Sequence, residues 1–317
     1  MKAVFLDRST ISDKINFNNL EQCFHTVSYF DHSSSEKVVS RCRFADVIIT
    51  NKVIISADMM SQLPKLRLIC IAATGTNNVD LVAAKRHGIA VCNVSGYSTS
   101  SVSQYVFAML LEHMQKSSEY IASVRTDKWQ NSPVFCHFES PIEELAGQTI
   151  ALIGYGEIAR AVERIARAFS MQVIIAERQH ESRIRPGRVA FEQALAQADV
   201  VSLHAPLSAA TENLINAETL ALMKRSAILI NTARGGLVNS EHLLSALKLK
   251  RIKAAILDVL ENEPPNADHP LIAHKLDNLY ITGHIAWGSQ QAQQRLIDGI
   301  ADNIIAFQQG LVRNRVD

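Results

Sequence analysis

Short apolar runs alternate with helix-like patterns along the whole chain of 317 residues. Each run is too short for a helix, so the runs are best explained as strands. They lie at residues 4–6, 27–30, 47–49, 68–71, 90–92, 150–153, 173–175, 200–203, 228–230, 256–257 and 280–281. Apolar strands separated by helices are typical of parallel sheets that are covered on both faces. The chain is therefore predicted to be an α/β protein, and its length favours two domains.

The run at residues 150–153 is followed directly by a glycine-rich turn, Gly154-Tyr155-Gly156-Glu157-Ile158-Ala159. Gly154 permits a tight turn, and Gly156 lets the backbone approach a pyrophosphate. Ala159 occupies a position where close packing requires Gly or Ala. A helix follows, and its first N–H groups are free to bind phosphates. The turn and its context predict a dinucleotide site.

Glu177 lies 21 residues past Gly156, at the end of the next strand. An acid at this position bonds the ribose hydroxyls and repels a 2′-phosphate, which favours NAD over NADP. The neighbouring Arg178 weakens this preference, because an arginine there accepts the phosphate. We therefore expect NAD as the cofactor, with NADP as the less favoured alternative.

The position of the glycine turn also indicates how the domains are arranged. Such a turn normally follows the first strand of its domain, yet here a series of strands and helices precedes it. We therefore expect two Rossmann-like or flavodoxin-like domains with parallel sheets, one inserted into the other. Residues 98–288 would form the dinucleotide-binding domain, and residues 1–97 with 289–317 the substrate-binding domain. The apolar periodicity of residues 290–307 predicts a helix that returns to the first domain.

Three reactive side chains follow three of the strands in the second half. Arg234 comes after residues 228–230, Glu263 after the strand at 256–257, and His284 after residues 280–281. Ligands of open parallel sheets bind beyond the carboxyl ends of the strands, so these side chains can converge at one edge. Such a set suits hydride transfer to an anionic carbonyl substrate.

Each of these side chains also has a structural explanation. Arg234 could be a surface arginine, although the two glycines after it favour close packing at a site. His284 could be a core histidine, unless an acid such as Glu263 holds its ring. Glu261 and Glu263 could equally be solvated acids of one loop. The segment His204-Ala205-Pro206 is interpreted as part of the cofactor rim or as packing.

Several motifs together resemble the D-isomer-specific 2-hydroxyacid dehydrogenase family. In chain order they are AATGTNNVD at 72–80, VSGYSTSSVSQ at 94–104, GYGEIA at 154–159, HAPL at 204–207, INTARGGLV at 230–238, DVLENEP at 258–264 and HIAW at 284–287. Within that family the chain is most similar to glycerate dehydrogenases, also called hydroxypyruvate reductases. The resemblance implies NAD-dependent reduction of a small 2-keto acid, with hydroxypyruvate or glyoxylate giving D-glycerate or glycolate.

The resemblance also implies roles for individual residues. It makes Arg234 the substrate-orienting arginine, Glu263 the partner of the histidine and His284 the acid/base. The loop Ala73-Thr74-Gly75-Thr76 would hold the substrate carboxylate through backbone N–H groups. Residues Thr232, Ala233 and Asp258 would line the nicotinamide side. The family usually has proline before the histidine, and Gly283 in that place makes the position of His284 less certain.

Composition excludes several classes of function. The formal net charge is +1 and no basic stretch alternates with aromatic residues, which argues against a nucleic-acid partner. No apolar stretch is long enough to span a bilayer, and no metal-ligand spacing is present. The five cysteines are odd in number and unpaired in spacing, as expected in the cytoplasm.

Two other functions are compatible with the sequence, and one oligomeric state is predicted. A formate- or phosphite-type dehydrogenase would use the same arginine and histidine framework. A non-catalytic NAD-sensing corepressor of this family would bind the cofactor without turnover. The helix expected at 102–114 is more apolar than one buried face requires, so we expect a homodimer built on the cofactor domain.

Overall fold

The computed structural model describes residues 1–317, which form two compact units. Unit 1 comprises Met1–Ser98 and Trp287–Asp317, and unit 2 comprises Thr99–Ala286. The chain leaves unit 1, builds unit 2 and then completes unit 1, so one α/β unit is inserted into the other. The predicted fold class is confirmed.

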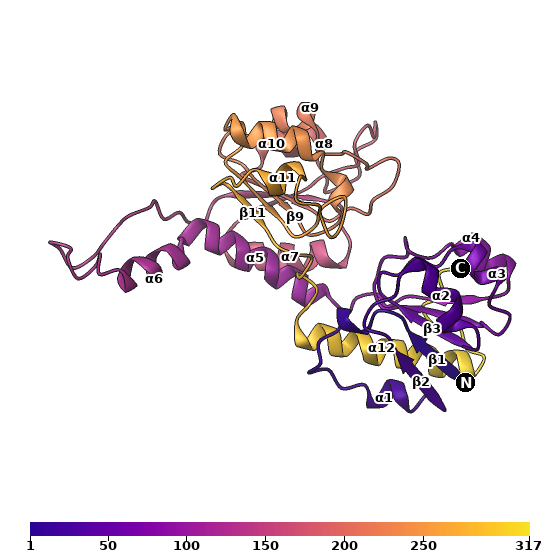
Figure 1. Cartoon of the computed structure of the whole chain (residues 1–317). Helices are drawn as coiled ribbons and strands as arrows, with labels where there is room; N and C mark the ends of the chain where they lie inside the picture. Colours follow the sequence, from indigo (N-terminus) through magenta and orange to yellow (C-terminus); the bar gives the residue numbers. More distant parts are fainter. The chain divides into compact units, whose positions relative to one another are not determined.

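Unit 1 is a five-stranded sheet of order β2-β1-β3-β4-β5 in which all neighbours are parallel. Its strands are β1 (Lys2–Phe5), β2 (Thr26–Tyr29), β3 (Val47–Thr50), β4 (Leu68–Ile71) and β5 (Ala90–Cys92). One core layer holds α1 (Asn18–Glu21) and α12 (Gln290–Gln308), and the other holds α2 (Ser35–Cys42), α3 (Ala57–Ser61) and α4 (Leu81–Arg86). The sheet is therefore covered on both faces (Figure 1).

Unit 2 is a six-stranded parallel sheet of order β11-β10-β9-β8-β6-β7. Its strands are β6 (Thr149–Ile153), β7 (Gln172–Ile175), β8 (Val200–Leu203), β9 (Ile228–Asn231), β10 (Ala254–Leu257) and β11 (Leu279–Ile281). On one face lie α5 (Thr99–Gln115) and α7 (Glu157–Ala168). On the other lie α8 (Phe191–Gln197), α9 (Ala217–Leu222), α10 (Ser240–Lys248) and α11 (Pro270–Ala273).

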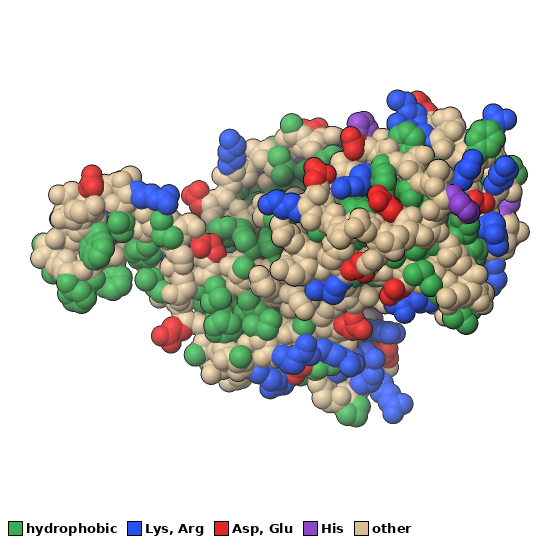
Figure 2. All heavy atoms as spheres, turned by 90° about the horizontal axis from the view of Figure 1, so that it is seen from below, with side chains coloured by type: hydrophobic (Ala, Val, Ile, Leu, Met, Phe, Trp, Pro, Cys, Tyr) green, Lys and Arg blue, Asp and Glu red, His purple; other side chains and the backbone are tan.

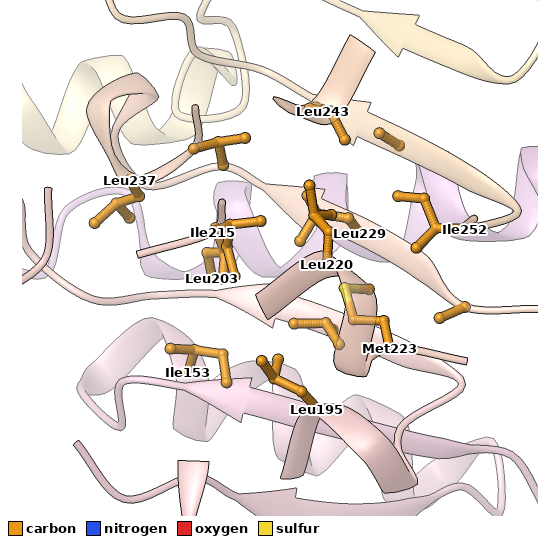
Figure 3. Packing of buried hydrophobic residues seen from close by; sticks show 14 of the residues in the cluster. Ile153, Leu195, Leu203, Ile215, Leu220, Met223, Leu229, Leu237, Leu243 and Ile252 are labelled. Atoms are coloured by element: carbon orange, nitrogen blue, oxygen red, sulfur yellow. The ribbon is translucent and has the colours of Figure 1, made fainter. Parts of the chain in front are cut away.

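The central strands of unit 2 are apolar along their whole length because helices cover both of their faces. Figure 3 shows the core cluster on one face of the sheet, where Leu203 and Leu229 of the strands lie in one layer with Leu195 of α8, Leu220 of α9 and Leu243 of α10. None of the helices in either unit is long and apolar enough to cross a membrane. Because helices cover both faces of the sheet, the buried strands hold the loops at their carboxyl ends in place.

Helix α7 differs in one respect from the stripe that its sequence indicates. Ile158, Val162, Ile165 and Phe169 have helical spacing, yet the residues buried against β6 are the small Ala159, Val162 and Ala166. Phe169, just past the helix end, is 38% exposed and stacks on Phe107 of α5 at 5.6 Å between ring centroids. Small residues face the sheet because a helix that follows a glycine turn packs close to its strand.

Strand order reverses at β6, which lies between β7 and β8. Connections leave the carboxyl ends of β6 and β8 on opposite sides, so a crevice opens between them. The glycine turn after β6 and the segment after β8 border this crevice, which is where an open α/β sheet binds its ligand.

Buried His113 on α5 gives unit 2 a pH-dependent stability. Its Nδ1 lies 3.2 Å from the Tyr280 hydroxyl, and burial, assisted by Lys116 and Lys253, lowers the pKa of His113 to about 4. An unfolded histidine has a pKa of about 6.5, so below that pH the unfolded chain binds more protons and unit 2 loses stability. Between pH 7 and pH 5 we expect His113 to account for a loss of about 2 kcal/mol.

Urea unfolding of the wild type and His113→Gln at the two pH values measures this contribution. The variant should show a smaller difference between pH 7 and pH 5 than the wild type. An unchanged difference would mean that His113 is not the group responsible.

Candidate active site at the strand ends of unit 2

The six strands of unit 2 end at one edge, and the residues singled out in the sequence follow these ends. They are Gly154, Tyr155, Gly156, Glu157 and Ile158 after β6, Glu177 and Arg178 after β7, His204, Ala205 and Pro206 after β8, Thr232, Ala233 and Arg234 after β9, Asp258 and Glu263 after β10, and His284 after β11. The parallel register of the sheet brings these loops to a common edge. Residues 73–76 follow β4 and belong to unit 1.

The glycine turn after β6 is tight, and it leaves backbone donors free. Gly154 has φ +88°, and a Cβ on it would lie 2.7 Å from the backbone of His204 and Ala205. Gly156, the residue before α7, has no side-chain cap, so the N–H groups of Glu157 and Ile158 have no acceptor within the protein. The start of α7 therefore presents free donors and the positive end of its dipole.

The side chain of Tyr155 does not cover the free N–H groups at the start of α7. Its hydroxyl donates a hydrogen bond to Glu163 on α7, and the Arg160 guanidinium lies 5.2 Å from the ring centroid. On the other side of the turn, His204 Nε2 lies 2.9 Å from the Ser202 hydroxyl, and burial lowers the pKa of His204 to about 4. His204 is therefore neutral at physiological pH and borders the turn. This agrees with both interpretations of the segment, as cofactor rim or as packing.

Alanine substitutions at the two glycines should separate folding from cofactor binding. Gly156→Ala should lower the free energy of unfolding by about 1 kcal/mol at most, since an added Cβ meets nothing within 4 Å and Ala is only a poorer N-cap than Gly. It should raise the Kd for NADH about tenfold or more, because the Cβ stands where the pyrophosphate approaches. Gly154→Ala should lose both stability and binding, because φ +88° disfavours a side chain.

Calorimetric titration with NADH and thermal unfolding of both variants check this pair. Equal NADH affinity in Gly156→Ala and the wild type would contradict the placement of the pyrophosphate.

Glu177 is buried and already bound by its own loop, which the sequence did not indicate. Its carboxylate accepts hydrogen bonds from the backbone N–H groups of Arg178 (2.8 Å) and Arg185 (3.2 Å) and from the Arg185 guanidinium, whose Nε lies at 2.7 Å. The bond from Arg185 is the main reason that the pKa of Glu177 is well below its usual range. A carboxylate has about four acceptor positions, and all are used here. The charge of Glu177 is thus paired within its own loop, and its role at the ribose hydroxyls stays a prediction.

The loop after β9 is shaped by Asn231. Asn231 Oδ1 accepts a hydrogen bond from the Ala233 N–H (3.0 Å), and its Nδ2 donates to the Arg234 carbonyl (2.8 Å). Thr232 Oγ1 is buried without any hydrogen-bond partner. An orphaned buried hydroxyl calls for a ligand, so Thr232 fits a polar group of a bound cofactor.

Arg234 is half-buried at the same edge. One Nη1–H donates to the carbonyl of Ala233 (2.6 Å), and no acidic side chain pairs with the guanidinium. Its remaining donors are thus available to a carboxylate, for which the guanidinium fork is well matched. A Cβ on the next residue, Gly235, would lie 1.8 Å from the carbonyl carbon of Leu260. The close packing expected after Arg234 is found at this glycine.

His284 and Glu263 lie side by side. His284 Nδ1 is 2.6 Å from Glu263 Oε2, and the two side chains are 23% and 32% exposed. Glu263 Oε1 in turn accepts a hydrogen bond from the Leu260 N–H (3.0 Å). The pair that sequence alone left open is therefore assembled in the structure, and Nε2 is the ring nitrogen left for another partner.

Buried Asp258 holds the turn that carries His284, a function that sequence reasoning missed. His284 has φ +56°, a left-handed conformation that is strained for this residue. The His284 N–H donates to the Asp258 carbonyl, and the Asp258 carboxylate accepts from the N–H groups of Ile285 and Ala286, all at 2.8 Å. Thr282 also donates to this carboxylate (2.7 Å). Burial raises the pKa of Asp258 despite these bonds.

These contacts resolve the question raised by Gly283. The backbone N–H of Gly283 has no acceptor, and its φ lies outside the left-handed region. The turn is fixed by Asp258 instead, so proline is not needed to place His284. The carboxylate of Asp258 is hydrogen-bonded within the protein, and its place at the nicotinamide side stays a prediction.

Comparison with known proteins gives a consistent result. Residues 107–286 match the family of the D-isomer specific 2-hydroxyacid dehydrogenase, NAD binding domain. The chain is 40% identical over 316 residues to the glycerate dehydrogenase of Methylorubrum extorquens, covering 100% of this chain and 99% of that one. It is 34% identical over 324 residues to the hydroxypyruvate reductase of Blautia hydrogenotrophica, covering 100% of both. A solved acyclic imino acid reductase in complex with NADPH and D-Arg has a TM-score of 0.85 and 28% identity, covering 100% of both chains.

Proposed function

Because the chain belongs to the D-isomer specific 2-hydroxyacid dehydrogenase family, we propose that it reduces hydroxypyruvate or glyoxylate to D-glycerate or glycolate with NADH. The chain is an oxidoreductase of hydroxy acids, and unit 2 is its NAD-binding domain. The observation that carries the proposal is the 2.6 Å contact of His284 with Glu263 at the strand edge that also bears Arg234.

Three side chains of unit 2 take part in the proposed chemistry. Bound NADH supplies the hydride that adds to C2 of the keto acid. His284 donates a proton from Nε2 to the oxygen that gains charge, while Glu263 at Nδ1 stabilises the protonated ring. Arg234 binds the carboxylate and the carbonyl oxygen, and it stabilises the negative charge that develops there.

The loop Ala73-Thr74-Gly75-Thr76 of unit 1 is assigned to the substrate carboxylate. The N–H groups of these four residues have no acceptor within the protein. The loop is fixed by the bond from Thr74 Oγ1 to the Val94 carbonyl (3.0 Å) and from the Val94 N–H to the Ala73 carbonyl (3.1 Å). Successive free N–H groups form an anion-binding concavity, which supports this assignment.

Initial rates with a panel of 2-keto acids test the proposed function. Hydroxypyruvate and glyoxylate should be reduced with higher kcat/KM than longer 2-keto acids, and NADH should be compared with NADPH because one relative was solved with NADPH. NADH binding without turnover of any keto acid would favour a corepressor-like binding protein. NAD reduction by formate or phosphite would favour the other enzyme class.

An exposed arm of unit 2 supports a homodimer. The arm consists of α6 (Ser117–Arg125) and residues 126–143, and it is held together by its own bonds, such as Trp129 Nε1 to the Phe135 carbonyl (2.9 Å). Phe135 is 91% and Phe138 75% exposed, and Figure 2 shows hydrophobic side chains gathered on this lobe at the left. Such a patch marks an interaction surface.

The same unit offers a place for that arm on a second copy. A groove of about 540 Å³ runs between α5 and α7 and is lined by Phe107, Leu111 and Ile165 among others. An arm that seats in the groove of its partner, and receives the partner's arm in return, forms a closed two-fold contact. We therefore assign the arm to a second copy of this chain.

The five cysteines are free thiols, which supports a reducing compartment such as the cytoplasm.

Charges placed on the arm should dissociate the dimer. Phe135→Asp combined with Phe138→Asp should give a monomer by light scattering at micromolar concentration, because two charges cannot be buried unpaired. Leu249→Asp, at a 65% exposed position at the end of α10, is the matched control and should remain dimeric. A monomeric wild type would refute this assembly.

A further inference from the structure

The loop after β10 carries two glutamates that have different partners. Glu263 faces His284, as described above. Glu261, two residues earlier, accepts a hydrogen bond from the Ser240 hydroxyl (2.8 Å), and its Oε2 lies 3.3 Å from His269 Nε2. Glu261 therefore ties the loop to Ser240 and His269, while Glu263 contacts His284, the proposed proton donor.

The two partners of Glu261 are buried and fixed. Ser240, the first residue of α10, is 5% exposed, and His269, which precedes α11, is 8% exposed. His269 Nδ1 accepts a hydrogen bond from the Leu271 N–H (3.3 Å), so Nε2 carries the proton in the neutral ring. Nε2 makes no hydrogen bond, and its contact with an acid is the 3.3 Å approach to Glu261 Oε2. Removing Glu261 would take the acceptor from the buried Ser240 hydroxyl and the carboxylate from His269 Nε2.

The backbone of the loop is confined on its other side by Gly235. A Cβ on Gly235 would stand 2.1 Å from the Leu260 carbonyl oxygen and 2.2 Å from the Glu261 N–H nitrogen. Leu260 also donates its own N–H to Glu263 Oε1 (3.0 Å). The position of Glu263 is thus set by the peptide at 260–261, and that peptide is clamped between Gly235 and the side-chain bonds of Glu261.

We propose that Glu261 is a positioning residue for proton transfer: hydrogen-bonded to Ser240 and in contact with His269, it holds Glu263 against His284. This inference rests on the proposed function, in which His284 is the proton donor. The contacts of the Glu261 side chain are with Ser240 and His269. It acts through the loop, so its loss should change how well Glu263 stabilises the protonated ring rather than remove a reacting group.

Two variants and a control test the inference in the full-length chain. Glu261→Ala should lower kcat/KM for hydroxypyruvate about 10- to 100-fold, the scale of a small misplacement of a reacting group. The fall of kcat/KM on the alkaline side should begin at lower pH, and the Kd for NADH should not change. Ser240→Ala, the milder variant, should shift the alkaline fall of kcat/KM to lower pH as well, but by less. Glu241→Ala, at an exposed neighbouring acid of α10, is the matched control and should behave as the wild type.

An NMR titration of the His284 ring separates this inference from the proposed function. The charged groups facing the ring are Glu263 and Asp258, and both are kept in every variant. The ring should titrate at lower pH in Glu261→Ala than in the wild type, whether or not hydroxypyruvate is the substrate. The inference would be overturned by a folded Glu261→Ala or Ser240→Ala protein that is less stable but otherwise unchanged. In such a protein the His284 ring would titrate as in the wild type, and kcat/KM would fall at the same alkaline pH. An unreactive wild type would refute the proposed function alone.

Discussion

Replacing His284 by alanine is expected to lower kcat for hydroxypyruvate reduction by about 10²–10⁴-fold, the usual contribution of general acid catalysis. The side chain lies at the strand edge with its Nδ1 bound by Glu263, and no other histidine follows a neighbouring strand of this edge except the neutral His204. The Kd for NADH should stay within about twofold, since the pyrophosphate is assigned to the turn after β6. Steady-state kinetics and NADH titration measure both quantities.

Two further variants serve as controls for this assignment. Glu263→Gln keeps the shape of the side chain but not its charge, so the alkaline fall of kcat/KM should move to lower pH. Arg234→Ala should raise KM as well as lower kcat, because the guanidinium binds substrate and transition state alike. Full reductase activity in His284→Ala would refute the role of the histidine.

A single methyl group at Gly235 is expected to damage both folding and activity. Its Cβ would overlap the backbone of Leu260 and Glu261 at distances down to 1.8 Å, and backbone cannot move aside as a side chain does. We expect Gly235→Ala to reduce the free energy of unfolding by about 1–3 kcal/mol or more. It should also lower kcat/KM at least as strongly as Glu261→Ala, because it displaces the loop that carries Glu263. Urea unfolding and initial rates test both parts.

The neighbouring glycine provides the matched control. A Cβ on Gly236 would lie 3.0 Å from Leu207 Cδ2, the end of a flexible side chain that can turn away. Gly236→Ala should therefore retain most of the stability and activity. Equal damage in both variants would contradict the view that the contact of Gly235 with the 260–261 peptide is what matters.

The arrangement of strands could be predicted because parallel strands buried on both faces must be apolar throughout. The runs at 150–153 and 228–230 needed no knowledge of their neighbours to be recognised. The buried face of α7 could not be predicted from size alone. The sheet selects Ala159 and Ala166 for close approach, while the larger Phe169 stacks on Phe107 at the surface.

Residues of the candidate site could be located by their place after strands, but their partners could not. Glu261 and Glu263 are equivalent in sequence, and only the fold directs one to Ser240 and the other to His284. Asp258 was expected near the nicotinamide, yet its carboxylate binds the turn of His284. Glu177 was expected at the ribose, and the sequence did not indicate that Arg185, eight residues later, donates a hydrogen bond to it. Such pairings depend on loop conformations that local patterns do not encode.

Chiral analysis of the product made from hydroxypyruvate and NADH tests the central claim most directly. The wild-type protein should convert one hydroxypyruvate for each NADH oxidised and should yield D-glycerate, and His284→Ala should form it about 10²–10⁴-fold more slowly. Formation of L-glycerate, or tight binding of NADH without oxidation by hydroxypyruvate or glyoxylate, would contradict the account.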